Sequence, residues 1–233
     1  LNSLGEQTAQ LTNALEDFDH PRAYEYLEWD VAQSSWTKDH LHLFEKEQAE
    51  VLRFFLSRFE QIQPTYAELR KSVIHGDVND NNILVSDDLA QPRVTGIIDY
   101  GDAVYSQTIN ELAVALAYAV MHKPDLLSAA VQVIKGYNSH FPLEEKEIDC
   151  LYTLVAMRLI ITVTKSALNK QEEPENTYHQ ISEKPAWDVL KKLKTIHPNF
   201  AKATFRSACG YTPQENEVEV RKWLEQQTVS LKN

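Results

Sequence analysis

The sequence VIHGDVNDNNILV at residues 73–85 differs in pattern from the segments around it. It begins and ends with short apolar runs, and a loop of hydrogen-bonding residues lies between them. The loop residues of chemical interest are His75, Gly76, Asp77 and Asn82. Short apolar runs bounded by Asn, Asp and Gly predict β-strands joined by a turn or loop. We therefore expect Asp77 and Asn82, five positions apart, to lie in a loop between two strands.

A second unit of the same kind, GIIDYGD, follows at residues 96–102. Its apolar run ends at Asp99, and Gly101 and Asp102 come shortly after. Because glycine adopts backbone conformations that are closed to other residues, we expect Gly101 to let the chain turn at once. The Asp99 carboxylate would then point out of the strand, and we expect the two loops to face each other across one site.

The spacing of Asp77 and Asn82 is typical of a phosphotransferase catalytic loop, Asp-x-x-x-x-Asn. An aspartate at this position accepts the proton of an attacking hydroxyl. Asn82 can offer an amide oxygen, and Asp99 a carboxylate, to Mg²⁺, a hard cation that prefers oxygen ligands. Phosphoryl transfer depends mainly on positioning and charge neutralisation, so one base and two metal ligands form a coherent minimal set. An Asn- and Asp-rich turn would explain residues 79–81, but it would not explain the second unit.

The rest of the sequence is mainly helical by the spacing of its apolar residues. Helices are expected at residues 1–18, 41–59, 64–70, 108–121, 124–139, 143–168, 182–195, 200–208 and 213–228. Short strands are expected at 73–74, 83–85 and 94–98, a loop or short helix at 24–36, and a polar link at 169–176. The sequence therefore predicts an α+β, mainly α fold, in which a small β-hairpin element carries the two loops.

Composition limits the classes of partner. The chain has 233 residues, a hydrophobic content of 43% and a formal net charge of −11, and this acidic balance argues against nucleic acid or an anionic membrane surface. The apolar stretch at 148–168 is interrupted by Asp149, Arg158 and Lys165, which favours a core helix over a membrane span. The N-terminus lacks the basic region and apolar core of a signal peptide. We therefore expect a cytoplasmic protein.

The two loops resemble those of the aminoglycoside phosphotransferase and choline kinase group, relatives of the protein kinases. The resemblance covers nearly the whole chain, and it is strongest to the branch that contains hydroxylysine kinases and the phosphotransferase domains fused to class III aminotransferases. Stretches that support it are residues 73–77, 96–119, 141–143, 157–159, 181–187 and 205–210. The resemblance implies that Asp77 is the catalytic base and that Asn82 and Asp99 bind Mg²⁺ and the nucleotide. It also implies that His75, with Gly76 and Gly101, shapes the loops.

This chain departs from that group in its first part. It has six glycines, none of which forms a Gly-rich loop over phosphates, and no strand in residues 1–72 presents a lysine for the donor phosphates. The resemblance therefore implies that residues 1–233 are the helical C-terminal lobe of a protein-kinase-like fold, with the N-terminal lobe absent. The group often has Asp-Leu-Ala after the metal loop, whereas this chain has Glu111 followed by Leu112 and Ala113. Since the carboxylate is kept, we expect Glu111 to brace the catalytic loop.

Four further residues are candidates for contact with a substrate. Asp80 and Asp102 could present negative charge to an amine, and the ring of Tyr105 could wall a cation pocket. Structural or solvated roles are the alternative for each of them. Arg158 stands inside an apolar helix, where a buried arginine needs a partner. We expect an internal ion pair there, and the alternative is binding of a substrate carboxylate.

Three hypotheses follow for the function. The first is an ATP- or GTP-dependent kinase that acts on the hydroxyl of a small amine or amino alcohol, with hydroxylysine, ethanolamine-type compounds and homoserine ahead of aminoglycosides by resemblance. This chain would be inactive alone, and a missing N-terminal lobe and a fused aminotransferase domain would be its partners. The second is a non-catalytic pseudokinase or regulatory module of a larger multidomain enzyme. The third is a metallophosphoesterase built on His75, Asp77, Asp99 and Asp102, for which further His and Asn ligands are not found in the sequence.

Overall fold

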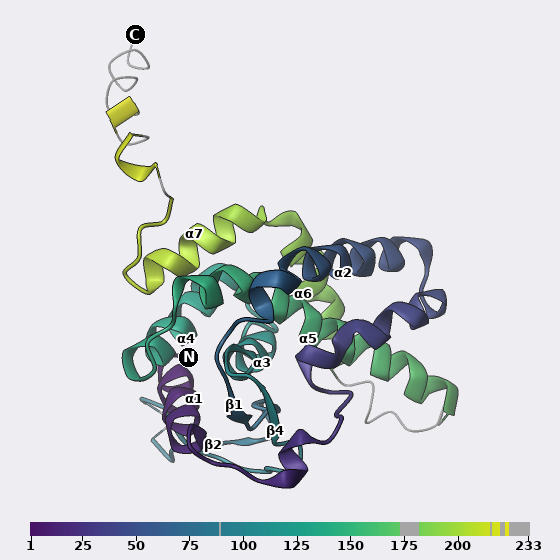
Figure 1. Ribbon diagram of the computed structural model, residues 1–233, viewed down its shortest axis with the longest axis horizontal. Helices are drawn as coiled ribbons and strands as arrows, with labels where there is room; N and C mark the ends of the chain where they lie inside the picture. Colours follow the sequence, from purple (N-terminus) through teal and green to yellow (C-terminus); the bar gives the residue numbers. More distant parts are fainter. Residues whose placement is uncertain (89, 173–181, 215, 220–221, 224–233) are drawn as a thin grey trace.

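Helices make up most of the structure. The computed structural model describes residues 1–88, 90–172, 182–214, 216–219 and 222–223. Its α-helices are α1 (Asn2–Leu15), α2 (Lys46–Tyr66), α3 (Ile109–Ala119), α4 (Leu126–His140), α5 (Glu145–Glu172), α6 (Glu183–Thr195) and α7 (Pro198–Ala208). Two 3₁₀ segments, η1 (Pro21–Tyr24) and η2 (Val31–Leu43), join α1 to α2. The strands are β1 (Lys71–Ile74), β2 (Ile83–Val85), β3 (Val94–Ile97) and β4 (Val104–Gln107). The predicted α+β, mainly α fold is confirmed (Figure 1).

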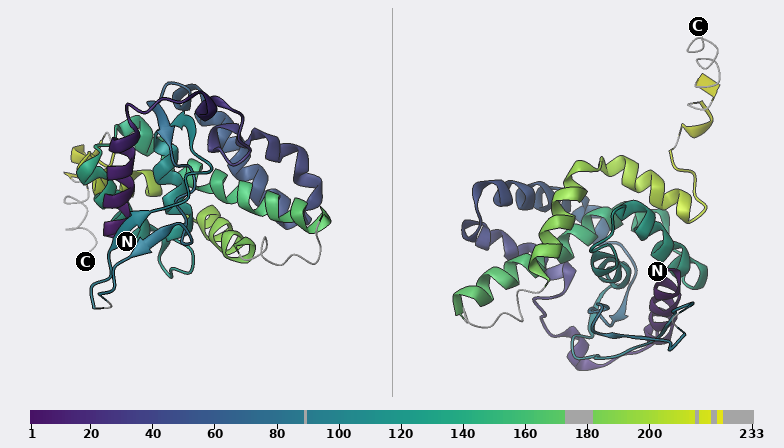
Figure 2. Two further views of the ribbon diagram at one scale, coloured as in Figure 1. Left: turned by 90° about the horizontal axis from the view of Figure 1, so that it is seen from below. Right: turned by 180° about the vertical axis from the view of Figure 1, so that it is seen from behind.

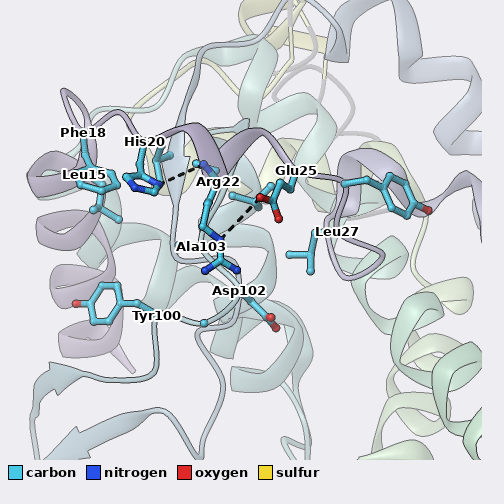
Figure 3. A pocket seen from close by; sticks show the side chains of 14 residues that line it. Leu15, Phe18, His20, Arg22, Glu25, Leu27, Tyr100, Asp102 and Ala103 are labelled. Carbon is cyan, nitrogen blue, oxygen red and sulfur yellow. Dashed lines mark hydrogen bonds and ion pairs between the residues drawn. The ribbon is translucent and has the colours of Figure 1, made fainter.

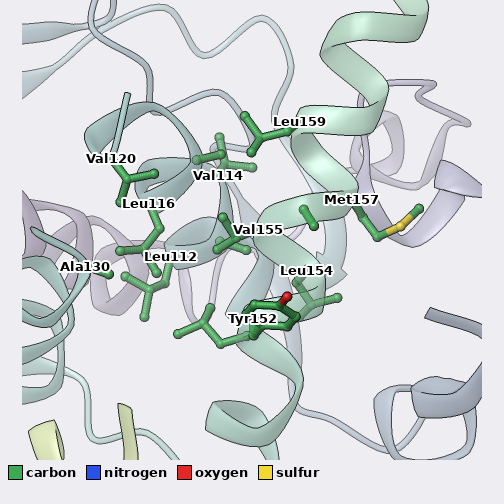
Figure 4. Close-up of a cluster of buried hydrophobic side chains, with 14 of the residues drawn as sticks. Leu112, Val114, Leu116, Val120, Ala130, Tyr152, Leu154, Val155, Met157 and Leu159 are labelled. Atoms are coloured by element: carbon green, nitrogen blue, oxygen red, sulfur yellow. The ribbon is translucent and has the colours of Figure 1, made fainter. Parts of the chain in front are cut away.

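The core is organised around α5. This helix packs against η2 and against α2, α3, α6 and α7, and its middle is buried on all sides. Leu112 and Leu116 of α3 and Leu154 and Leu159 of α5 are fully buried in the cluster that Figure 4 shows. By length and composition α5 could cross a membrane, but 83% of its most apolar stretch is buried inside the fold. The apolar stretch is therefore the core helix that the sequence predicts.

The strands form two antiparallel pairs. β2 and β3 form the expected hairpin, with Ile83 opposite Ile97. β1 pairs with β4, which the sequence reading missed. Ser106 and Gln107 of β4 are polar but buried, and Ser106 Oγ donates to Asp30 at 2.7 Å. Because these polar residues break the apolar alternation that marks a strand, β4 gives little signal in the sequence.

Two expected boundaries between residues 31 and 70 are wrong. The helix expected at 41–59 is divided, because η2 continues to Leu43 and α2 begins only after Glu45, which forms a capping box with Gln48. The short helix expected from Pro64 is instead the end of α2. Since Pro64 lies in the last turn, it removes a single helical hydrogen bond and α2 can continue past it. The polar link expected at 169–176 is also partly wrong, because α5 continues to Glu172. Residues 173–181, like half of the helix expected at 213–228, lie outside the described residues.

Helices α1 and α4 approach each other unusually closely. A Cβ atom added at Gly5 would lie 2.0 Å from the carbonyl oxygen of Val133. One added at Gly136 would lie 2.1 Å from the carbonyl oxygen of Asn2. Both distances are far inside van der Waals contact, so only glycine fits at either position. This packing places α1 beside α4 (Figures 1 and 2) and leads the chain into η1, next to the site loops.

Candidate active site

The backbone of the first loop, at His75 and Gly76, is held by the side chain of Glu111. The Glu111 side chain at the start of α3 is fully buried, and its carboxylate accepts hydrogen bonds from the backbone nitrogens of His75 (2.5 Å) and Gly76 (3.4 Å). Burial raises the pKa of Glu111 to about 7, although the two N–H groups and the positive charge of Arg158 act in the opposite direction. The expected brace therefore lies directly behind the loop.

His75 and Gly76 shape the loop further. The buried His75 ring accepts from the backbone N–H of Asp77 through Nδ1 (3.2 Å), so Nε2 carries the hydrogen and donates to the carbonyl oxygen of Ile98 (3.0 Å). Gly76 adopts a φ of 76°, and a Cβ atom there would lie 3.1 Å from the carbonyl oxygen of Asp102. The first loop thus turns at Gly76 and is tied to the second loop through His75.

The second loop turns at Asp99 itself. Asp99 has a φ of 68°, in the left-handed region that aspartate tolerates better than most residues. Gly101 does not have a positive φ, so the turn expected at Gly101 belongs to Asp99. Gly101 instead allows a close approach, because its N–H lies 3.3 Å from Asp99 Oδ1 and a Cβ atom there would lie equally near. Such backbone strain is often concentrated at functional sites.

The carboxylate of Asp77 has three donors around it. Its Oδ2 accepts from the amide nitrogens of Asn79 and Asn82, each at 2.9 Å. Its Oδ1 accepts from the guanidinium of Arg158 at 2.6 Å. The internal ion pair expected for Arg158 is therefore confirmed, and its partner is the candidate base.

Asn82 and Asp99 fit a magnesium site by the chemistry of their donors. The amide nitrogen of Asn82 donates to the backbone and side-chain oxygens of Asp77, so the amide oxygen of Asn82 is the atom that could coordinate a cation. The backbone oxygen of Asn82 accepts from the N–H of Ile98 at 2.9 Å, which places the exposed Asp99 next to it. Among the described residues, no group of three or more His, Cys, Asp or Glu side chains could hold a metal ion. An amide and one carboxylate suit Mg²⁺, which usually takes one or two carboxylates and completes its shell with phosphates and water. A metallophosphoesterase needs a richer set of ligands.

A cavity of about 300 Å³ opens beside Asp77. It is lined by Trp29, Asp77, Asn79, Asp80, Asn81, Asp102, Tyr118, Arg158, Thr162, Lys165, Ser166, Asn169 and Ser182. Burial and the negative charges of Asp77 and Asp99 raise the pKa of Asp102, although the positive charge of Arg158 acts in the opposite direction. Asp77, Asp80, Asp102 and Arg158 are thus brought together.

A second cavity, of about 700 Å³, also has Asp102 in its lining. Leu15, Phe18, His20 and Arg22 form part of its wall, and Tyr100 and Asp102 face it from the second loop (Figure 3). Figure 3 also shows Tyr100 and Asp102 leaving the loop in different directions. Asp102 therefore lines both cavities.

Tyr105 is not placed with these residues. Its half-exposed ring lies on β4 and packs against Tyr24 at 4.8 Å between ring centroids, and it lines neither cavity. Conversely, the sequence reading missed Tyr118 and a polar stripe along α5. Tyr118 follows Glu111 by seven positions, which puts both on one face of α3. The stripe consists of Arg158, Thr162, Lys165, Ser166 and Asn169, at helical spacing in an otherwise apolar helix.

Two curated proteins are similar to this chain over most of its length. Hydroxylysine kinase from Xenopus laevis is 30% identical over 211 residues, which cover 84% of this chain and 56% of that protein. Hydroxylysine kinase from Mus musculus is 28% identical over 207 residues, which cover 83% of this chain and 54% of that protein. The chain thus spans about half the length of the relatives it matches.

Solved structures show the same fold. A choline/ethanolamine kinase family protein from Mesorhizobium loti has a TM-score of 0.61 at 12% identity, with 89% of this chain and 65% of that chain covered. A microcompartment-associated aminopropanol kinase has a TM-score of 0.60 at 18% identity, with 89% and 62% covered. A family model described as the phosphotransferase enzyme family matches residues 1–144, which is more than half of the chain. The chain therefore belongs to the phosphotransferase enzyme family.

Proposed function

We propose that the full-length protein is a small-molecule kinase, which transfers the γ-phosphoryl group of ATP or GTP to the hydroxyl of a small amine or amino alcohol. The observation that carries this proposal is the position of Asp77 in the wall of the 300 Å³ cavity. Its carboxylate is hydrogen-bonded to Asn82, and the Asn82 backbone is hydrogen-bonded to the strand end before Asp99. These hydrogen bonds connect the proposed base to both candidate metal ligands.

Each side chain has a distinct role in this proposal. Asp77 orients the acceptor hydroxyl and accepts its proton. Asn82 and Asp99 hold Mg²⁺, which supplies charge neutralisation for the donor phosphates when it is bound. His75 and Glu111 keep the first loop in register with the second, so the catalytic groups need little rearrangement during the reaction.

The cavity supports a small acceptor with groups of both signs. Its lining contains the carboxylates of Asp77, Asp80 and Asp102 as well as the cation of Lys165. An amino acid with a hydroxyl, such as hydroxylysine or homoserine, matches both signs, and an ethanolamine-type compound matches the carboxylates alone. A volume of about 300 Å³ is at the low end for ligand sites, which favours these compounds over the much larger aminoglycosides. The hydroxylysine kinases among the relatives support the same order.

We further propose that residues outside this chain form an N-terminal lobe that covers the nucleotide, and that this chain alone turns over nothing. Support comes from the length of the relatives, of which the chain spans about half. It also comes from exposed apolar side chains beside the site loops, at Leu84, Val85, Ile98 and Tyr100. The resemblance adds a fused aminotransferase domain as a candidate partner, and the cytoplasm as the expected location.

A panel of hydroxylated amines tests the proposal. The full-length protein is incubated with Mg²⁺, with ATP or GTP, and with hydroxylysine, homoserine, ethanolamine or an aminoglycoside, and phosphorylated product is measured. We expect product with at least one small acceptor and loss of product in Asp77→Ala. The matched control is Asp87→Ala, at an exposed aspartate in the loop between β2 and β3, which should keep full activity.

Two results would contradict the proposal. Full activity of Asp77→Ala would overturn the assignment of the base. A folded wild-type protein that binds Mg-nucleotide but phosphorylates no acceptor would favour a pseudokinase or regulatory module instead.

A further inference from the structure

We propose that Arg158 is a positioning residue for the transfer step, which fixes the Asp77 carboxylate in the orientation that the acceptor hydroxyl requires. The inference rests on the proposed kinase function, and it adds a residue from α5 to the site. Arg158 lies outside residues 1–144, the part of the chain that the family model matches.

The guanidinium of Arg158 is held by three separate segments. One terminal nitrogen donates to the carbonyl oxygen of Trp29 at 3.0 Å. The other donates to Asp77 Oδ1 at 2.6 Å and to the hydroxyl of Tyr118 at 3.2 Å. The aromatic rings of Trp29 and Tyr118 also lie 4.8 and 5.5 Å from the guanidinium carbon. These contacts fix the plane of the guanidinium, and therefore the direction from which it meets Asp77.

The burial of this charge calls for a functional reason. The side chain of Arg158 is only 2% exposed, in the middle of the core helix α5, where all its neighbours along the chain from Cys150 to Thr164 are buried. Placing a charge there is costly unless the charge is paired with good geometry. The carboxylate in this pair belongs to Asp77, which is 22% exposed and lines the cavity, where a purely structural partner would be poorly protected from water. The pair is therefore placed where it orients a reacting group.

The hydrogen bonds around Asp77 show what the orientation achieves. A carboxylate has about four acceptor positions. Asn79 and Asn82 use two of them on Oδ2, and Arg158 uses one on Oδ1. One position is left for a further donor, and the cavity is the space beside it. Because the other three acceptor positions are occupied, the acceptor hydroxyl can donate to Asp77 only at the fourth position.

Binding of a substrate carboxylate by Arg158 fits the structure less well. Both terminal nitrogens already donate to protein oxygens, and almost no surface of the side chain is exposed. A positioning role predicts a fall in kcat with little change in the KM of the acceptor, whereas carboxylate binding predicts a rise in KM.

The test compares Arg158→Lys and Arg158→Ala with the wild type in the full-length protein, using the best acceptor from the panel. Lysine keeps the charge but loses the planar fork. We expect kcat to fall about 100-fold in both variants, as expected when a reacting group is misplaced by about 1 Å. The KM of the acceptor and the affinity for Mg-nucleotide should stay within about twofold of wild type. Millimolar methylguanidine should restore part of the kcat of Arg158→Ala, which a structural role would not allow.

Two further variants separate positioning from general damage. Arg206→Ala removes another largely buried arginine, whose Nε donates to Asp149 Oδ1 at 2.8 Å. Neither residue of this pair lines the 300 Å³ cavity, so the variant should lower stability but leave kcat unchanged. Tyr118→Phe removes one contact of the guanidinium and keeps the ring, so it should fold even where Arg158 variants do not, and should lower kcat several-fold.

The failure of this inference is distinct from that of the proposed function. An active wild type with unchanged kcat in Arg158→Lys and Tyr118→Phe, or with an effect confined to the KM of the acceptor, would overturn the positioning role alone. A full-length wild type that phosphorylates no acceptor would overturn the proposed function and, with it, this inference.

Discussion

The Nε2 atom of His75 lies 3.0 Å from the carbonyl oxygen of Ile98, and this contact joins the two loops of the site. The same ring accepts from the N–H of Asp77 at 3.2 Å, and it packs edge-on against Tyr100 with 4.9 Å between ring centroids. One fully buried side chain therefore holds both the residue that would receive the hydroxyl proton and the strand end before Asp99.

His75→Ala should destabilise the protein by about 2 kcal/mol, because it leaves the N–H of Asp77 and the carbonyl of Ile98 without their partner. Urea unfolding measures the loss. The exposed His42→Ala serves as the control and should change the free energy of unfolding by less than about 0.5 kcal/mol. Equal stability of the two variants would show that the ring does not hold the loops together.

Glu111→Gln should change how stability depends on pH. The pKa of buried Glu111 is raised to about 7 in the folded protein, from 4.5. A raised carboxyl pKa adds stability that is fully present below the unfolded value and is lost as the pH rises through the folded value. The wild type should therefore gain stability relative to Glu111→Gln as the pH falls from about 7 to about 4.5, by at most about 3 kcal/mol.

Urea unfolding of both proteins across that pH range provides the measurement. At higher pH the ionised carboxylate accepts from His75 and Gly76, whereas glutamine offers one acceptor oxygen, so the variant should also be less stable there. Stability curves that run parallel from about pH 8 to about pH 5 would contradict the raised pKa.

Gly5→Ala and Gly136→Ala should each cost about 3 kcal/mol or more, since the added methyl group would overlap the backbone of the facing helix. Thermal or urea unfolding tests this directly. Gly96→Ala in β3 is the matched control, because its Cβ would lie 3.5 Å from the nearest atom, at ordinary contact distance. If all three variants had the same free energy of unfolding, the close packing of α1 against α4 would be wrong.

The sequence predicts the fold where apolar periodicity is strong. The strands at 83–85 and 94–98 and most helices follow from that spacing alone, and the structure has them within a few residues. Prediction from the sequence fails where polar residues are buried in a strand or where a helix cap begins a new helix inside an apolar pattern. Ser106 of β4 is buried and its hydroxyl donates to Asp30. The capping box at Glu45 marks the start of α2 after η2 ends. Such contacts between distant segments leave no local pattern.

In the candidate site, too, local features can be predicted from the sequence, whereas contacts between distant residues cannot. The spacing of Asp77 and Asn82 and the strand end at Asp99 are local features, and they suggest the loops directly from the sequence. That Arg158 needs a partner is also visible in the sequence, because the residue interrupts an apolar helix. Which partner it takes is not visible, since 81 positions separate it from Asp77.

We propose that the two loops have separate roles, with Asp99 of the second loop holding the metal and Asp77 of the first loop acting on the acceptor. Calorimetric titration of nucleotide into the full-length protein, with and without Mg²⁺, tests it for the wild type, Asp77→Ala and Asp99→Ala. We expect Mg²⁺ to strengthen binding in the wild type and in Asp77→Ala but not in Asp99→Ala. Nucleotide binding that is independent of Mg²⁺ and unaffected by Asp99→Ala would contradict the metal-binding role of Asp99.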